Sequence, residues 1–345
     1  MIEGLRLENF RVFEQAEFSF GPVTVIVGNN GVGKTSILEA ISMLSLTTSW
    51  KTEKDSEVVR WEAPFTRVTS GDRELVVQVH PYMKRMKIDG ISKRATEVIG
   101  SFPTILFEPD DLSLLYAAPS QRRQYIDRTI SQTSQAYTRA VLQMQQVLKQ
   151  RNRLLKNIQE GMAGESELPF WDQQLAELQE VIQEERAAFL TFLQEKVPAV
   201  FDGMVPGGLD SQIHYLKSPH AAEQEFRHHL EKNRYKEIAA GVSLYGPHRE
   251  DFSVTWAGHP VEQGMSRGQS RALMVAFKMA ELDYIAERSE KRPVLLLDDI
   301  FSELDLERRH RLFSVLSGYQ VIMTTTELGA VQEMIAGEVS VISLA

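Results

Sequence analysis

The stretch GNNGVGKTS, residues 28–36, constrains the fold more than any other part of the chain. It follows an apolar run, residues 23–27, and precedes an apolar helix start. Glycines let the backbone curl so that its N–H groups point inward, and the next helix adds its positive N-terminal end. The stretch therefore predicts a strand, a phosphate-binding loop and a helix rather than a chance glycine-rich turn. The fixed positions of the pattern G-x-x-x-x-G-K-[ST] are filled by Gly28, Gly33, Lys34 and Thr35.

This loop predicts binding of a nucleoside triphosphate. Lys34 is expected to reach the β- and γ-phosphates, and the Thr35 hydroxyl to hold Mg²⁺. The residues expected to line the nucleotide are Gly28, Asn29, Asn30, Gly31, Val32, Gly33, Lys34, Thr35 and Ser36.

Composition excludes several classes of protein. The 345 residues can bury a large core, which predicts two lobes rather than one. The absence of cysteine excludes disulfides and zinc sites built on sulfur. No apolar run approaches the ~20 residues that span a bilayer, and the N-terminus lacks a signal-peptide pattern, so a cytoplasmic protein without a membrane partner is expected. The net charge of −9 argues against general coating of nucleic acid but permits a local basic surface.

The pattern of elements predicts an α/β fold with a P-loop lobe, built on a mixed or parallel sheet, and a mainly helical second lobe. Residues 1–118 form the first part of the P-loop lobe, with alternating strands and a hairpin turning at Asp89-Gly90. Residues 119–245 form the helical lobe, where three–four spacing on both sides of residues 161–169 predicts a short antiparallel hairpin. Residues 246–345 complete the P-loop lobe.

The two halves of the helical hairpin carry opposite charges. Residues 120–160 carry eight basic side chains against two acidic ones, and residues 165–195 carry eight acidic side chains against Arg186 alone. Either the first helix contacts nucleic acid, or its cations pair with the acidic helix along the seam.

The stretch RPVLLLDDIFSELD, residues 292–305, supplies the carboxylates that the phosphate-binding loop lacks. Its apolar residues predict a buried parallel strand that ends in two aspartates. Asp298 is expected to bind Mg²⁺. Asp299, on the opposite side of the pleat, is expected to be catalytic with Lys34 by orienting or deprotonating an attacking water. The alternative is that the aspartates only cap the next helix.

The stretch GMSRGQSRAL, residues 264–273, resembles the signature motif of the ABC ATPase superfamily. Ser266, Gly268 and Gln269 open a long helix, where a hydroxyl, an N–H group and the helix dipole form a second phosphate site. The resemblance implies that this site faces the γ-phosphate held by another subunit. It therefore implies an ATP-dependent homodimer with the fold of an ABC-type ATPase head.

The order of the motifs narrows the resemblance to the RecF family. The landmarks are NFR (residues 9–11), ILFEPDDLSLL (105–115), RRQYIDR (122–128), GPHREDF (246–252), LLLDDIFSELD (295–305) and TTT (324–326). The resemblance implies a slow, dimerisation-dependent ATPase that acts in DNA repair, DNA replication and the SOS response to DNA damage. It implies binding of gapped DNA at junctions of single and double strands, help with RecA loading alongside RecO and RecR, and a nucleotide contact by Arg11. His248 and Arg249 are DNA or subunit contacts, or belong to a turn that ties strands together.

Residues 84–94 carry five basic side chains against one acidic one, which predicts a DNA contact or a solubilised edge hairpin. The candidates are Lys84, Arg85, Lys87, Lys93 and Arg94. Two competing functions are the nucleotide-binding subunit of a membrane transporter and a small-molecule kinase. The late signature motif disfavours the transporter, and a kinase leaves residues 266–270 and 302–305 without a role.

Overall fold

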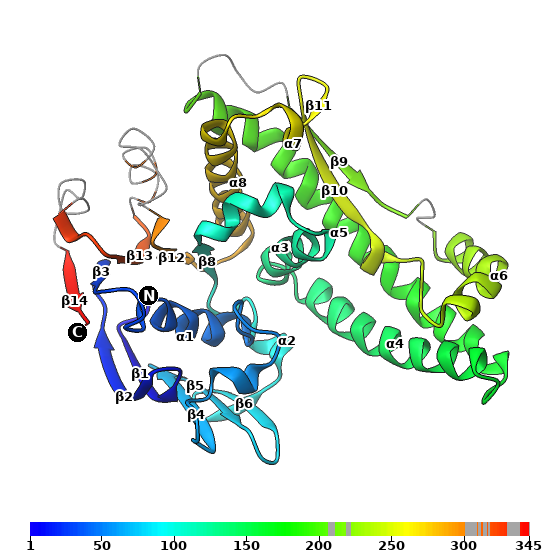
Figure 1. Cartoon of the computed structure of the whole chain (residues 1–345), viewed down its shortest axis with the longest axis horizontal. Coiled ribbons are helices and arrows are strands. Elements are labelled where there is room, and N and C mark those ends of the chain that lie inside the picture. The colour runs from blue at the N-terminus through cyan, green and yellow to red at the C-terminus, as the bar shows by residue number, and fades with distance from the viewer. Residues whose placement is uncertain are drawn as a thin grey trace. The chain divides into compact units, whose positions relative to one another are not determined.

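The computed structural model describes residues 1–205, 211–218, 222–300, 318–329 and 339–344, with Arg309, Leu312 and Leu316 as single positions. The chain divides into two compact units, which Figure 1 colours along the sequence. Unit 1 consists of Met1–Ser113, Gly203–Pro206 and Arg267–Ala345. Unit 2 consists of Leu114–Asp202 and Gly207–Ser266.

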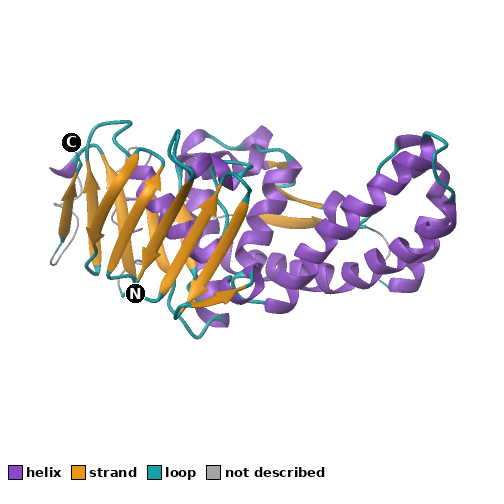
Figure 2. Ribbon diagram, turned by 90° about the horizontal axis from the view of Figure 1, so that it is seen from below, coloured by secondary structure: helices purple, strands orange, loops and turns teal. Residues whose placement is uncertain are grey.

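Unit 1 contains a six-stranded antiparallel sheet with the order β2-β1-β4-β5-β6-β7, seen among the orange strands of Figure 2. Alternate residues face the core, so that Leu5 and Leu7 are buried while Arg6 is exposed. Asp89 and Gly90 both have positive φ, 53° and 73°, as a two-residue hairpin turn requires, and they confirm the predicted hairpin. The strands are β1 (Gly4–Phe10), β2 (Phe13–Ser19), β4 (Phe65–Ser70), β5 (Arg73–Gln78), β6 (Met83–Ile88) and β7 (Ile91–Lys93).

The second sheet of unit 1 is parallel, with the order β14-β3-β13-β12-β8. Its inner strands are nearly continuous apolar runs, as expected for a sheet buried on both faces. Helix α1 (Lys34–Leu46) contacts strands of both sheets and fills the core between them. The predicted α/β class with a parallel sheet is therefore confirmed. The strands are β3 (Val23–Val27), β8 (Thr104–Phe107), β12 (Val294–Asp298), β13 (Gln320–Thr325) and β14 (Ser340–Ser343).

Helix α8 (Arg267–Arg288) is anchored to β8 by a buried lysine. Lys278, only 2% exposed, donates to the carbonyl oxygen of Leu106 at 2.7 Å. Its ammonium lies 3.1 Å from Asp111 and 3.2 Å from Glu281. Two carboxylates and a carbonyl thus replace the water that a buried ammonium loses.

Unit 2 is mainly helical and confirms the predicted hairpin. Helices α4 (Gln135–Gln159) and α5 (Leu168–Asp202) pack together, and α3 (Pro119–Ser131) and α6 (Glu223–Ala240) pack against them. The sequence reasoning missed β9 (Ser211–Leu216), which pairs with β10 (Asp251–Trp256) and so draws residues 246–266 into unit 2. This division differs from the predicted boundary at residue 245, which assigned residues 246–266 to the P-loop lobe. The remaining short elements are α2 (Ala95–Val98), α7 (Val261–Gly264), β11 (His259–Pro260) and the 3-10 helices Asp55–Val58, Pro109–Tyr116, Glu165–Glu167 and Pro247–Arg249.

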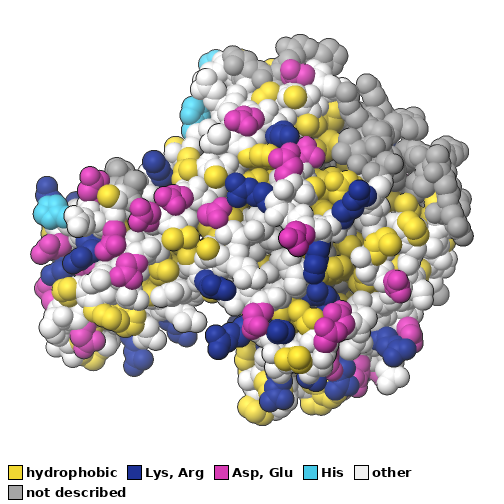
Figure 3. Space-filling view, turned by 180° about the vertical axis from the view of Figure 1, so that it is seen from behind, with side chains coloured by type: hydrophobic (Ala, Val, Ile, Leu, Met, Phe, Trp, Pro, Cys, Tyr) yellow, Lys and Arg dark blue, Asp and Glu magenta, His cyan; other side chains and the backbone are white. Residues whose placement is uncertain are grey.

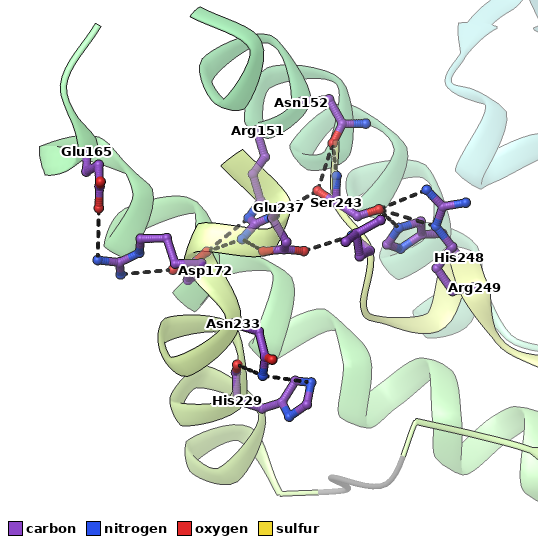
Figure 4. A network of polar contacts seen from close by, with 12 residues as sticks. Arg151, Asn152, Glu165, Asp172, His229, Asn233, Glu237, Ser243, His248 and Arg249 are labelled. Atoms are coloured by element: carbon purple, nitrogen blue, oxygen red, sulfur yellow. Dashed lines mark hydrogen bonds and ion pairs between the residues drawn. The ribbon is translucent and has the colours of Figure 1, made fainter. Parts of the chain in front are cut away.

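A fully buried arginine holds α4, α5 and α6 together (Figure 4). Arg151 donates to Asp172 of α5 at 2.7 Å and 2.9 Å, and to Glu237 of α6 at 2.5 Å. Its third nitrogen donates to the hydroxyl of Ser243 at 2.8 Å. The predicted pairing across the hairpin seam is thus correct for Arg151. Lys156, another cation of α4, does not pair across the seam but with Glu160 at the C-cap of the same helix.

The GPHREDF segment lies beside this cluster. His248 and Arg249 both bond to the carbonyl oxygen of Ser243, at 3.2 Å for the His248 Nε2 and 3.0 Å for the Arg249 Nη2. Arg186 donates to the carbonyl oxygen of Pro247 at 2.7 Å. These contacts favour the interpretation in which the segment ties neighbouring elements together.

We expect Arg151→Ala to lower the free energy of unfolding of unit 2 by about 3–5 kcal/mol, because it leaves Asp172 and Glu237 buried without a cation. Helical circular dichroism during urea unfolding measures the change. Lys149→Ala, at an exposed position of the same helix, is the control and is expected to change it by about 0.5 kcal/mol or less. Equal effects of the two substitutions would contradict the role of the cluster.

We expect His248 to make stability depend on pH. Burial of the ring, followed by the nearby arginines, lowers its pKa from 6.5 to about 4, although the bond to Ser243 opposes this. Between these pH values the unfolded ring binds a proton and the folded ring does not, so stability falls as pH falls from 6.5 towards 4, by up to about 1.4 kcal/mol per pH unit. Urea unfolding of the wild type and of His248→Gln should diverge in this window and run parallel above pH 7.

Candidate nucleotide-binding site

The loop between β3 and α1 depends on glycine at two positions. Gly33, with φ 103°, caps α1, and a Cβ there would lie 2.7 Å from the Phe13 ring and 2.8 Å from Val12. A Cβ on Gly28 would lie 2.7 Å from the carbonyl oxygen of Leu344. A larger residue at either position would displace the loop, because neighbouring side chains and backbone already pack against it.

Lys34 is the first residue of α1 and is 8% exposed. Its Nζ donates to the carbonyl oxygens of Gly28 and Asn29 at 2.7 Å and 2.9 Å. The ammonium therefore lies against the loop and beside the positive end of the helix, where it adds to the potential that attracts phosphate. Asn29, Asn30 and Gly31 form the exposed part of the loop.

Thr35 and Asp298 meet although 263 residues separate them. Parallel pairing of β3, β13 and β12 brings the carboxyl ends of these strands to one edge of the sheet, where α1 begins. There the Thr35 hydroxyl donates to Asp298 Oδ1 at 2.9 Å. A hydroxyl and a carboxylate beside a phosphate-binding loop are the oxygen ligands that Mg²⁺ prefers when it also binds phosphate. The residues present therefore fit a magnesium ion.

Thr324 joins the two aspartates and was missed as a site residue. It is fully buried in β13, opposite Asp298 in the strand register. Its hydroxyl donates to Asp298 Oδ1 at 2.7 Å and accepts from the backbone N–H of Asp299 at 3.0 Å. The signal in the sequence was the run TTT at the end of an apolar strand. Thr325, the next residue of this run, bonds instead to the backbone of Glu327.

Asp299 does not continue the strand. β12 ends at Asp298, and Asp299 has φ 48°, in the left-handed region. The expected position on the opposite side of the pleat is therefore corrected to a tight turn, in which the Thr324 bond fixes the backbone. A left-handed residue other than glycine is strained by about 1–2 kcal/mol, and such strain is common at functional sites.

Arg11 lies in the turn between β1 and β2, with φ 53°. Its guanidinium donates to both oxygens of Glu39 in α1, at 2.9 Å and 2.5 Å, and to the carbonyl oxygen of Glu57 at 2.9 Å. Glu39 is buried, so this pair fixes Arg11 one turn beyond the loop. The nucleotide contact expected of Arg11 stays a prediction.

The signature residues stand at the start of α8. Arg267 is the first residue of this helix, so Ser266 precedes it and Gly268 and Gln269 lie in its first turn. The SELD segment, residues 302–305, lies outside the described residues.

The basic residues of the β6–β7 hairpin do not share one face. Lys84 lies on the side of buried Met86, where it pairs with Asp55 at 2.6 Å. Lys87 pairs with Glu74 at 2.6 Å and Lys93 with Glu97 at 3.5 Å. Arg85 and Arg94 are exposed and form no ion pair with any residue described. On the face shown in Figure 3, basic and acidic side chains are likewise interspersed.

Comparison with known proteins identifies the family. The model of the family "RecF/RecN/SMC N terminal domain" matches residues 1–343. "DNA replication and repair protein RecF" of Moorella thermoacetica is 38% identical over 95% of this chain and 90% of its own length. The protein of the same name from Lachnoclostridium phytofermentans is 35% identical over 95% and 93%.

Solved structures agree with this relationship. The structure of "the recombination mediator protein RecF-ATPrS" has a TM-score of 0.87 at 30% identity and covers 98% of this chain and 94% of that one. An SMC head structure, at 16% identity and a TM-score of 0.53, covers 96% and 91% and shares the fold. Sequence and structure thus match along nearly the whole chain, and the chain belongs to the RecF family.

Proposed function

We propose that this protein is an ATP-dependent, DNA-binding ATPase of recombinational repair and replication-fork maintenance. The convergence of Thr35 and Asp298 on one point beside the phosphate-binding loop carries this proposal. The names of the relatives, "DNA replication and repair protein RecF", support the cellular role. The titles of the matched structures, RecF with ATP or ATPrS, support the nucleotide.

The loop residues 28–36 hold the phosphates of ATP, and Lys34 neutralises their charge. Thr35 and Asp298 supply the protein oxygens for Mg²⁺, which stabilises negative charge on the phosphates when bound. Thr324 keeps the Asp298 carboxylate in place through its 2.7 Å bond. Asp299 orients the attacking water and accepts its proton, and the turn at φ 48° holds it at the strand end.

The active form is an ATP-dependent homodimer, and hydrolysis is slow and depends on dimerisation. Ser266, Gly268 and Gln269 stand at the N-terminus of a 22-residue helix, where N–H groups and the helix dipole favour an anion. In the dimer this end of α8 faces the γ-phosphate bound by the other chain. Arg11 adds a nucleotide contact from the β1–β2 turn.

The dimer binds gapped DNA at junctions of single and double strands and acts with RecO and RecR in loading RecA. Arg85 and Arg94 are the strongest candidates for a DNA contact on the β6–β7 hairpin, because Lys84, Lys87 and Lys93 are engaged by carboxylates. A transporter subunit is not favoured, since the family match covers residues 1–343. No helix within the described ranges combines the length and apolar character needed to cross a bilayer.

Two substitutions separate binding from hydrolysis. Lys34→Ala removes the cation at the phosphates and is expected to abolish ATP binding and dimerisation together. Asp299→Asn keeps the side-chain shape and is expected to leave ATP bound while slowing hydrolysis by at least about 100-fold, the lower range for a general base. Equilibrium binding of a fluorescent ATP analogue and single-turnover hydrolysis measure both effects. Equal loss of nucleotide affinity in the two variants would refute the role of Asp299.

A mixing experiment tests the composite site. Ser266→Arg places a bulky cation where the γ-phosphate docks, so the variant should bind ATP as a monomer and fail to dimerise. A mixture with Lys34→Ala should rebuild one intact site, with Lys34 from one chain and Ser266 from the other. Sedimentation with a non-hydrolysable ATP analogue reports the dimer. Normal dimerisation of Ser266→Arg alone would show that the signature does not act across chains.

A further inference from the structure

Helix α4 exposes a surface without carboxylates in a protein whose net charge is −9. None of its 25 residues is acidic, whereas five are basic and eight are Gln or Asn. Arg151 points inward to the buried cluster. The other four cations are exposed, and we call them the α4 basic stripe: Arg139, Lys149, Arg153 and Lys156.

The stripe is a feature of the folded helix. At about 100° per residue, its four positions fall within an arc of roughly 100°. Gln146 and Gln150 lie between them on the same side and are also exposed. From Arg139 to Lys156 the stripe extends along about 26 Å of helix. The side of α4 that faces away from α5 and α6 is thus a straight row of cations and amides.

Pairing within the protein does not account for the stripe. Arg139 bonds to Gln135, an amide, at 3.3 Å. Lys149 and Arg153 form no ion pair with any residue in the described part of the chain. Lys156 has a single carboxylate, Glu160, at 3.9 Å and is 68% exposed. Exposed pairs of this geometry contribute less than about 1 kcal/mol.

The requirements of the helix do not account for it either. The helix dipole favours acidic residues in the first turn and basic ones in the last. The first turn of α4 contains no acidic residue, and of the stripe only Lys156 lies in the last turn. Exposed positions of the neighbouring helix α5 instead carry Glu177, Glu180 and Glu184. The two helices of one hairpin therefore present opposite charges to the solvent.

We infer that the α4 basic stripe binds the phosphate backbone of duplex DNA. A row of cations and amide donors, on a helix that has no acidic residue of its own, complements a regular row of phosphates, and each cation that meets a phosphate releases a counterion. The partner is a duplex because binding of single strands relies on stacking of bases on aromatic side chains. The only aromatic residue of α4, Tyr137, is fully buried.

This inference rests on the proposed function and adds a DNA contact in unit 2, separate from the β6–β7 hairpin of unit 1. The test is Lys149→Gln, Arg153→Gln and Lys156→Gln in one full-length chain. Glutamine keeps a high helix propensity, and thermal unfolding followed by circular dichroism confirms the fold. Binding to a 30-base-pair duplex and to a single strand of the same sequence is measured with a non-hydrolysable ATP analogue at 50–200 mM salt.

We expect weaker duplex binding and a salt slope smaller by about 0.9 for each lost phosphate contact. For three contacts, raising salt from 50 to 200 mM should then weaken the wild type about 40-fold more than the variant. Binding of the single strand should change little. The matched control removes three exposed cations of α6, Arg227→Gln, Lys232→Gln and Lys236→Gln, and should leave the slope of the wild type.

A second variant tests the absence of carboxylates while keeping every cation. Gln146→Glu with Gln150→Glu inserts two acids between the basic residues and should also weaken duplex binding. Its control, Gln212→Glu with Gln224→Glu, adds the same charge at exposed positions elsewhere in unit 2 and should not.

The outcomes separate the two proposals. If the wild type binds the duplex and both α4 variants bind it with the same affinity and slope, the inference is wrong and the proposed function stands. If the α6 control loses as much as the α4 variant, net charge rather than the stripe governs binding, and the inference is also wrong. If the wild type binds neither DNA, the proposed function fails and the inference with it.

Discussion

The carboxylate of Asp298 is the point on which the site is assembled. One of its oxygens accepts hydrogen bonds from Thr35 at the start of α1 and from Thr324 at the end of β13. These three residues lie far apart in the sequence, and only the parallel order β3-β13-β12 brings them together. The loop, the candidate metal ligand and the strained turn at Asp299 therefore share one support. A substitution that moves any one of them is therefore expected to move the other two.

Much of the site could be predicted from local patterns in the sequence. The glycine loop, the apolar strand ending in two aspartates and the helix after Ser266 each have a signature whose physical reason lies within a few residues. Thr324 was not predictable in the same way, because its role depends on which strand lies beside β12. The left-handed turn at Asp299 was missed for a similar reason, since a strand pattern shows where a strand runs but not where its last residue leaves the sheet.

Contacts between residues far apart in the sequence also decide between the two interpretations of the charged helical hairpin that the sequence left open. The opposite charges of residues 120–160 and 165–195 were compatible with a seam of ion pairs or with a binding surface. In the structure Arg151 turns inward to Asp172 and Glu237, while the stripe cations of the same helix face solvent. Helical spacing separates these two sets only once the buried side of α4 is known. Likewise, β9 escaped prediction because its alternation is short: only Ile213 and Tyr215 of SQIHYL mark a face, and both are only partly buried.

The buried lysine of α8 has a mechanical consequence. Nearly every residue from Ala272 to Ile285 is buried, and Lys278 ties the middle of this stretch to the end of β8 and to Asp111. Sliding the helix would pull an ammonium group away from two carboxylates in a region that water does not reach, which is costly. The middle of the helix and the end of β8 are therefore expected to move together, and the first turn of α8, with Gly268 and Gln269, belongs to the same helix. A ligand that pulls on that turn is therefore expected to transmit the displacement to the parallel sheet through β8, its edge strand.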